Sequence, residues 1–310
     1  MTAGLRRIGL RIALGLRRVL NLVVGHVAAF LLRLLRRTDP DRTADLLGAA
    51  MRRIGPHLRE HRIGRANLTA AFPEKSAAEI EAILAGVWDN LGRVAAEFPH
   101  LDRMWDYDRA NPEAGRARST PRDDALFDRM RDDGKPALVF AAHLANWEQP
   151  ILAAKAGGLD FAFLFRRPNL SGIADAIIAV RAGATGTMIA SSPDAPFRIA
   201  RALEHGQHVG LLVDQHYGNG VDVTFFGRTC KANPTLARLA RHIDCPIHGT
   251  RAIRLPNHCF RVEITDAITV PRDASGRVDV QGTMQVITTI VEGWVREHPE
   301  QWLWLHRRWR

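Results

Sequence analysis

A histidine and a glutamate five residues apart form the motif best suited to chemistry in this sequence. His143 and Glu148 enclose the segment His-Leu-Ala-Asn-Trp-Glu. On one continuous helix the two side chains would lie about 140° apart and would not meet. If His143 instead follows a strand and Asn146 caps the next helix, Glu148 lies in the first helical turn and folds back onto the imidazole. An imidazole oriented by a carboxylate is suited to act as a general base at neutral pH.

Two adjacent arginines and an asparagine form a second polar group. Arg166, Arg167 and Asn169 follow directly after the apolar run 161–165. Guanidinium groups bind phosphate through two parallel hydrogen bonds, so this group predicts a phosphate contact. A solvated pair of surface charges is the alternative interpretation.

A third polar group follows the apolar run 209–213. It reads Asp-Gln-His-Tyr-Gly-Asn-Gly and begins at Asp214. Its glycines permit a tight backbone, and Asp214 is placed to hydrogen-bond a substrate or an arginine. An ordinary polar turn would have the same composition, just as a lone histidine after a strand is often a structural hydrogen-bonding residue. Three such groups after three apolar runs favour one shared site.

The elements that must position these groups are short apolar runs alternating with helical stretches. This alternation predicts an α/β fold with a largely parallel sheet flanked by helices, whose carboxyl edge is the usual place for an active site. The expected strands are 137–142, 161–165, 187–190, 209–213, 246–253 and 260–264, and the expected helices lie near 147–156, 172–182, 194–204, 234–242 and 281–297.

The part of the chain before this region is expected to be mainly helical. Ser76, with Glu79 three residues later, predicts a capping box at the start of one helix. The polar stretch 106–124 is expected to be a loop or a mobile insertion. The predicted organisation is thus a basic apolar anchor at 1–37, followed by an enzyme domain at 38–310 with a helical part (38–130) and an α/β catalytic part (131–310).

The positive charge of the chain is concentrated near its N-terminus. The 310 residues carry a net charge of +10, and residues 1–65, with 14 arginines and four acidic residues, account for all of it. These arginines flank the apolar run 19–32, which is shorter than the roughly 20 residues that span a bilayer. We therefore expect a membrane-associated helix that lies in the interface or crosses with snorkelling arginines. A basic helix packed on its own domain is the alternative, and no nucleic-acid partner is expected.

Several other classes of site are not supported. Cys230, Cys245 and Cys259 contain no C-x-x-C pair, which argues against a disulfide framework or a structural zinc site. The segment from His57 to His61 matches the metallopeptidase pattern H-x-x-E-H, but it lies among arginines that repel a dication. The sequence contains no G-x-S-x-G, P-loop or G-x-G-x-x-G motif. We expect neither a metal nor an organic cofactor.

Motifs spread over most of the chain resemble those of the bacterial lipid A late acyltransferases. This lauroyl/myristoyl acyltransferase family belongs to the lysophospholipid acyltransferase superfamily. The matching residues are Arg65-Ala66-Asn67-Leu68, Ala71-Phe72-Pro73-Glu74, Trp88-Asp89-Asn90-Leu91-Gly92, His143 to Glu148, Arg167-Pro168-Asn169, Asp214-Gln215-His216-Tyr217-Gly218, Phe225-Phe226-Gly227 and Pro299-Glu300-Gln301-Trp302-Leu303-Trp304-Leu305-His306-Arg307-Arg308. The last of these motifs is the most specific.

The resemblance implies a reaction, its partners and its site residues. The enzyme would move a fatty acyl chain from acyl carrier protein to a hydroxyl of a lipid A precursor, at the cell inner membrane with the catalytic domain on the cytoplasmic face. His143 and Glu148 fall on the catalytic dyad of the family. The substrate-binding residues would be Arg166, Arg167, Asn169, Arg181, Asp214 and Tyr217.

Two departures from the family pattern leave the acceptor lipid open. His216 stands where many members carry aspartate, and Arg181 is the sole candidate for a second arginine of the family. An enzyme of the same superfamily that acts on a glycerophospholipid or an aminoacyl lipid is the main alternative. A non-catalytic basic membrane-binding protein is the other. The motifs contain no serine or cysteine nucleophile, so direct transfer without a covalent acyl-enzyme is expected.

Overall fold

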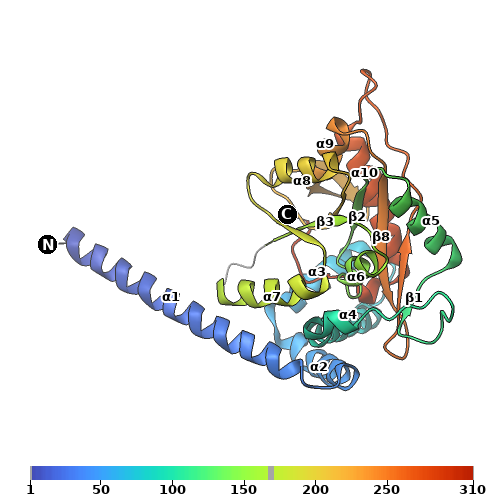
Figure 1. The fold of residues 1–310 in the computed structure, drawn as a ribbon. Helices are drawn as coiled ribbons and strands as arrows, with labels where there is room; N and C mark the ends of the chain where they lie inside the picture. Colours follow the sequence, from blue (N-terminus) through green and yellow to red (C-terminus); the bar gives the residue numbers. More distant parts are fainter. Residues whose placement is uncertain (1, 167–170, 310) are drawn as a thin grey trace.

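A mainly parallel sheet flanked by helices forms the body of the molecule, as the sequence predicts (Figure 1). The computed structural model describes residues 2–166 and 171–309. Within them the main sheet has the strand order β1-β9-β8-β2-β5-β3-β4, and only β8 and β9 pair antiparallel. Its strands are β1 (Ala117–Arg118), β2 (Leu138–Ala141), β3 (Phe161–Phe165), β4 (Thr187–Ala190), β5 (His208–Leu212), β8 (Ile247–Arg254) and β9 (Phe260–Ile264).

Each of the six expected strands overlaps a strand of this sheet. The structure adds β1, which lies within the stretch 106–124 that was expected to be a loop and pairs with β9. It also adds an antiparallel hairpin that the sequence pattern did not indicate, formed by β6 (Val221–Phe225) and β7 (Arg228–Ala232). Phe226 and Gly227 form its turn, both with positive φ. The turn needs this left-handed backbone, which glycine adopts without strain and phenylalanine rarely does.

The helices also follow the expected pattern, with one correction. They are α1 (Thr2–Leu35), α2 (Pro40–Ile54), α3 (Arg59–Ala71), α4 (Ala77–Glu97), α5 (Pro121–Asp132), α6 (Gln149–Ala156), α7 (Ser171–Ala184), α8 (Ala195–Glu204), α9 (Thr235–His242) and α10 (Val280–Glu297). The capping box of Ser76 and Glu79 is present at the start of α4. Residues 121–124, expected in a loop, belong to α5 because Thr120 caps that helix and Pro121 opens it.

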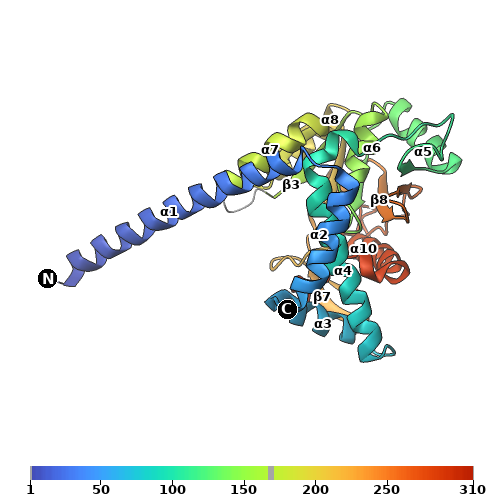
Figure 2. The same cartoon turned by 90° about the horizontal axis from the view of Figure 1, so that it is seen from below.

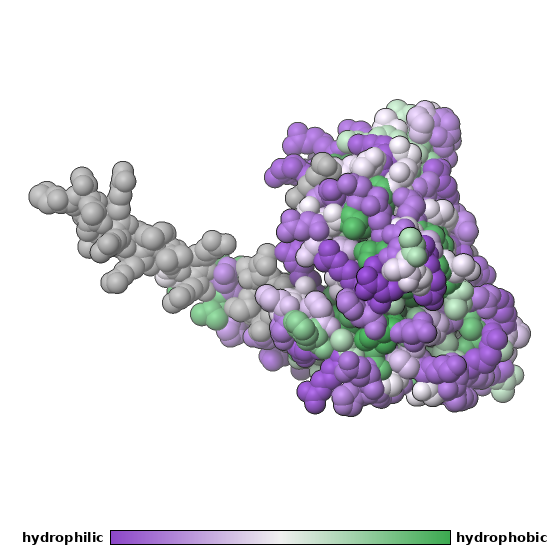
Figure 3. Space-filling model, turned by 90° about the horizontal axis from the view of Figure 1, so that it is seen from above, coloured by the Kyte–Doolittle hydropathy of each residue, from purple (hydrophilic) through white to green (hydrophobic). Residues whose placement is uncertain are grey.

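Helix α1 projects from the body of the molecule (Figures 1 and 2) and packs on α7. An ion pair between Arg36 and Asp102, with two nitrogen–oxygen distances of 2.8 Å, fixes the chain just after its carboxyl end. Large apolar side chains of α1 are nevertheless exposed, and Figure 3 shows hydrophobic atoms where this helix leaves the body. They are Val19, Leu20, Leu22, Val23, Val27, Phe30, Leu31 and Leu34. None of the helices in the described part of the chain is both long and apolar enough to cross a membrane.

The C-terminal segment is part of the core. The rings of Trp302 and Trp304 are buried and meet at right angles, with their centroids 4.6 Å apart. Phe225 of the hairpin packs edge-on against Trp302. Aromatic pairs in such T-shaped arrangements are favourable beyond the area they bury. The most specific sequence motif thus lies inside the fold, where it holds the hairpin against the sheet.

Candidate active site

His143 lies at the carboxyl edge of the sheet, where the sequence places it, but its carboxylate partner is Asp214. His143 follows β2 and Asp214 follows β5, and these two strands are parallel neighbours in the sheet. The Nδ1 atom of His143 is 2.8 Å from Oδ1 of Asp214, and the backbone N–H of His143 donates to Oδ2 at 2.8 Å. One carboxylate therefore fixes both the ring and the backbone of the histidine.

Asp214 is held in its ionised form by its surroundings. Its side chain is completely buried, and the indole Nε1 of Trp302 donates a third hydrogen bond to it at 2.8 Å. Burial alone would raise the pKa of the Asp214 carboxyl, but the charge of His143 and the hydrogen bonds from its ring and backbone outweigh burial and hold that pKa well below its usual range. A carboxylate at this position requires a hydrogen on Nδ1 of His143, so that in the neutral imidazole Nε2 is the acceptor.

Glu148 does not occupy the place beside the imidazole that the sequence predicts. Its buried carboxylate forms an ion pair with Arg181 of α7, whose Nε donates to Glu148 Oε2 at 3.1 Å. The reason is the path of the chain after β2. Glu148 is the residue immediately before α6 and faces α7, whereas Asp214 comes from the adjacent strand. Asn146 is not the N-cap of α6, but its Oδ1 accepts from the backbone N–H of Glu148 at 3.1 Å.

The structure places some of the predicted substrate-binding residues at the cavity and others elsewhere. Arg166 is exposed at the end of β3 and lines the same cavity as His143. Arg167 and Asn169 lie outside the described residues. Tyr217 also lines this cavity and is exposed. Asp214, expected to face substrate or an arginine, is instead buried behind the imidazole.

A cavity of about 610 Å³ begins at His143 and runs along one face of the sheet. Glu148 and Arg181 line its polar end together with Gln215, whose amide Nε2 is 3.4 Å from Nε2 of His143. The rest of the wall is mainly apolar and comes from β2, β3, β5, β9 and helices α5 and α6. Phe127, Ile151, Phe161, Phe163, Phe165 and Ile264 belong to it. A space of this size and lining can accommodate a long apolar chain, with the polar side chains at one end.

The loop that carries His143 is fastened by the C-terminal segment. The backbone N–H of Leu303 donates to the carbonyl of His143 at 3.2 Å, and that of Ala145 donates to the carbonyl of Gln301 at 2.9 Å. Ala145 has a φ of 47°, a strained conformation for a residue with a side chain. These backbone bonds hold the strained turn in place.

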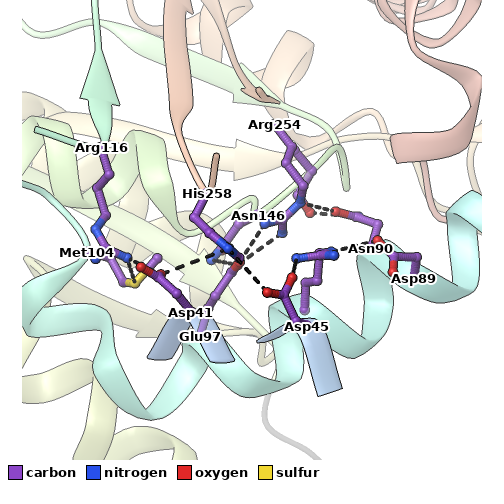
Figure 4. Close-up of polar contacts among 12 residues, drawn as sticks. Asp41, Asp45, Asp89, Asn90, Glu97, Met104, Arg116, Asn146, Arg254 and His258 are labelled. Atoms are coloured by element: carbon purple, nitrogen blue, oxygen red, sulfur yellow. Dashed lines mark hydrogen bonds and ion pairs between the residues drawn. The ribbon is translucent and has the colours of Figure 1, made fainter. Parts of the chain in front are cut away.

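A buried polar network supports the same loop from the other side (Figure 4). Asn146 donates to Glu97 at 2.9 Å, and Glu97 is paired with Arg254 of β8, whose Nη2 lies 3.0 Å away. Asn90 of α4 accepts from Arg254 Nε at 2.9 Å and donates to the carbonyl of Ala145 at 3.1 Å. Each member of this network has a partner, which buried polar groups require. Figure 4 shows these side chains converging from α4 and β8 on Asn146.

The sequence did not indicate the roles of two residues at this site. Trp302 and Gln215 belong to motifs of the family resemblance, but no neighbouring residue in the sequence indicates that either side chain contacts His143 or Asp214. The signal for the pair of His143 and Asp214 was present, because both residues follow apolar strands. The missing information was which strands are neighbours in the sheet.

The metallopeptidase-like pattern has a structural role. Nδ1 of His61 accepts a hydrogen bond from Trp88 Nε1 at 3.1 Å, and its Nε2 lies 3.1 Å from Glu81. Across the described ranges 2–166 and 171–309, no group of three or more histidine, cysteine, aspartate or glutamate side chains is placed to hold a metal ion.

Comparison with known families gives one result that covers nearly the whole chain. A family model described as bacterial lipid A biosynthesis acyltransferase matches residues 15–310. This match confirms the resemblance drawn from the sequence motifs. A search of curated proteins found no match.

Proposed function

The chain belongs to the family of bacterial lipid A biosynthesis acyltransferases and is therefore an acyltransferase, and from this we propose that it moves a fatty acyl chain from acyl carrier protein to a hydroxyl of a lipid A precursor. The observation that carries the proposal is the pair of His143 and Asp214 at the polar end of an apolar cavity. A base at the mouth of a space for an alkyl chain is the arrangement that acyl transfer to an alcohol requires.

In the proposed reaction, Nε2 of His143 removes the proton of the acceptor hydroxyl. The resulting oxygen attacks the thioester carbonyl, the carbon–sulfur bond breaks, and the imidazolium returns the proton to the leaving thiolate. Asp214 fixes the tautomer of the neutral imidazole before proton transfer and stabilises the imidazolium after it. The amide of Gln215, 3.4 Å from Nε2, is placed to donate to the oxyanion. General-base assistance of this kind contributes a factor of about 10²–10⁴.

Glu148 has a different part in this proposal from the one the family dyad suggests. Its carboxylate lines the same cavity but is paired with Arg181. We assign Glu148 to positioning Arg181 at the rim of the site, where the guanidinium faces an anionic group of the substrate. Arg166 lies on the same rim and supplies a second positive charge for a phosphate of the acceptor.

The exposed side of α1 supports attachment to a lipid surface. Its apolar residues between 19 and 34 are uncovered, and residues 1–65 carry the whole net charge of the chain. Each arginine near an anionic leaflet contributes about 1 kcal/mol, and buried apolar side chains add to this. We place the protein at the inner membrane, with its catalytic domain on the cytoplasmic face. The same positive charge favours an acidic donor such as acyl carrier protein.

The test uses the full chain in vesicles that contain the lipid acceptor. Acyl carrier protein and coenzyme A thioesters of the same chain are compared, and products are identified by mass spectrometry. We expect acylation of the lipid A precursor from the carrier-protein donor and none with His143→Ala. Acylation of a glycerophospholipid or an aminoacyl lipid instead would assign the enzyme to the alternative acceptor class. Full activity of His143→Ala would exclude the mechanism.

A further inference from the structure

Arg308 is a buried arginine in the C-terminal segment, and its hydrogen-bond partners among the described residues are backbone carbonyl oxygens. Only 2 % of the residue is exposed. Its Nη1 atom donates to the carbonyl of Lys231 at 2.6 Å and to the carbonyl of Gln215 at 3.4 Å. Its guanidinium also lies over the ring of Phe225, 5.5 Å from the ring centroid. A positive charge is thus held inside the fold by neutral groups.

This arrangement of a charge among neutral groups is costly for folding. Burial removes water from the guanidinium of Arg308, which lowers its pKa. The hydrogen bonds to two carbonyls and the contact with the ring of Phe225 offset part of this cost. Apolar side chains of similar volume often stabilise a buried position as well as charged groups do, or better. The stability of the core therefore does not explain an arginine at this position, and its role lies in what its hydrogen bonds hold.

The two carbonyls belong to segments that meet beside the candidate active site. Lys231 lies in β7 of the hairpin, and Gln215 lies in the loop that follows β5. The backbone N–H of Tyr217, in the same loop, donates to the carbonyl of Lys231 at 3.3 Å. The loop is therefore fastened to the hairpin directly at Tyr217 and, through Arg308, at Gln215. From this fastened backbone the amide Nε2 of Gln215 reaches to 3.4 Å from Nε2 of His143.

We propose that Arg308 is a positioning residue for acyl transfer, which fixes the backbone of Gln215 so that its amide stays where the oxyanion forms. The described part of the cavity wall does not include Arg308, so the guanidinium acts through Gln215 and not on the substrate. A donor that is already in place needs no reorganisation as negative charge develops. Loosening it should therefore lower kcat and leave KM for both substrates nearly unchanged. The proposal rests on the proposed function, because the oxyanion belongs to that reaction.

The experiment measures kcat and KM of full-length variants with the carrier-protein donor and the lipid acceptor. Gln215→Ala removes the oxyanion donor and should lower kcat about 10²-fold, whereas Arg308→Met leaves the donor loose and should lower kcat about tenfold. Arg308→Lys keeps a cation that can donate to both carbonyls, so it should recover most of this loss. Arg307→Met, at the exposed neighbouring arginine, is the matched control and should match the wild type. Wild-type kcat in Arg308→Met, or a loss confined to KM, would overturn the proposal.

A double variant separates positioning from a general structural role. If Arg308 acts through Gln215, adding Arg308→Met to Gln215→Ala should cause no further loss of kcat. An equal loss in both backgrounds would show a structural role and would overturn the proposal. If Arg308→Met does not fold, Arg308→Gln, which keeps one donor, takes its place in the same comparison.

The same assays distinguish this proposal from the proposed function. Full activity of Gln215→Ala, with His143→Ala inactive, would overturn the role of Arg308 and leave acyl transfer intact. A wild-type enzyme that transfers an acyl chain from neither thioester would contradict the proposed function itself, and with it the basis of this proposal.

Discussion

Asp214 accepts hydrogen bonds from both the ring and the backbone N–H of His143, and Trp302 donates to the same carboxylate oxygen as that backbone N–H. The carboxylate thus sets the orientation, the tautomer and the loop position of the histidine together. Glu148, only five residues from His143 in sequence, holds Arg181 instead. The two carboxylates therefore have separable roles that mutagenesis can distinguish.

Replacing Asp214 by asparagine should reduce kcat more than replacing Glu148 by glutamine. In Asp214→Asn the negative charge that stabilises the imidazolium is lost, and we expect a decrease of about 10²-fold or more. In Glu148→Gln the imidazole keeps its partner, so the main effect should be a higher KM for the lipid acceptor. Steady-state kinetics on both variants, with His143→Ala as the inactive reference, checks this order. A larger loss of kcat in Glu148→Gln would restore Glu148 as the partner of the base.

The pair of Asp214 and His143 should make folding stability depend on pH in the acid range. The pKa of Asp214 is lowered in the folded state, so the stability it adds is fully present above the unfolded pKa of about 4. That contribution is lost as the pH falls through the folded pKa. Denaturant unfolding of the wild type and of Asp214→Asn should therefore give a difference that is constant near neutrality and shrinks below about pH 4. A difference that grows with acidity would contradict the assigned direction.

Filling the middle of the cavity should shorten the acyl chain that the enzyme transfers. Gly210 lies in β5 between Val139 and Phe163, and all three line the cavity. A Cβ at Gly210 would meet the Cβ of Phe163 at 3.7 Å, an ordinary contact, so a larger side chain fits the strand and projects into the space. Gly210→Val should favour shorter donors in competition assays read by mass spectrometry. Gly293→Ala, on the exposed side of α10 with no atom within 4 Å of the added Cβ, is the control. An unchanged product distribution would place the chain outside this cavity.

The exposed apolar side chains of α1 should determine binding to vesicles. Leu20, Val23 and Phe30 are more than half exposed, so aspartate at these positions should leave the fold intact. Each apolar side chain buried in lipid contributes about 1–2 kcal/mol, so the triple variant should bind anionic vesicles at least tenfold more weakly in flotation assays. Leu46→Asp, on the exposed face of α2, is the control. Undiminished binding of the triple variant would locate the membrane surface in the catalytic domain.

The sequence predicted the sheet well because its strands are short apolar runs bounded by turns. It placed His143, Arg166 and Asp214 after the correct strands. It did not predict that β5, rather than a strand closer in sequence, lies beside β2, and this neighbour relation decides which carboxylate meets the imidazole. The five-residue spacing favoured Glu148 as the partner of His143, because a motif contains information only about residues that are close in sequence.

The hairpin and the interior position of Trp302 were harder to anticipate for a related reason. The apolar runs in residues 221–232 are only one or two residues long, so they give no strand pattern. The hairpin is stabilised by packing on the C-terminal aromatic side chains. Contacts between segments so distant in sequence leave no periodic pattern. The division of the chain at residues 37 and 130 stays a prediction.

The bonds from Gln301 and Leu303 to the loop of His143 have a consequence for protein synthesis. His143 is translated long before the residues that fasten its loop, and also long before Trp302, whose indole donates to Asp214. A growing chain on the ribosome can therefore form much of its sheet while the loop of His143 is still unfastened. We expect the proposed site to become ordered only after residues 301–303 have been made, and the sheet to form before it.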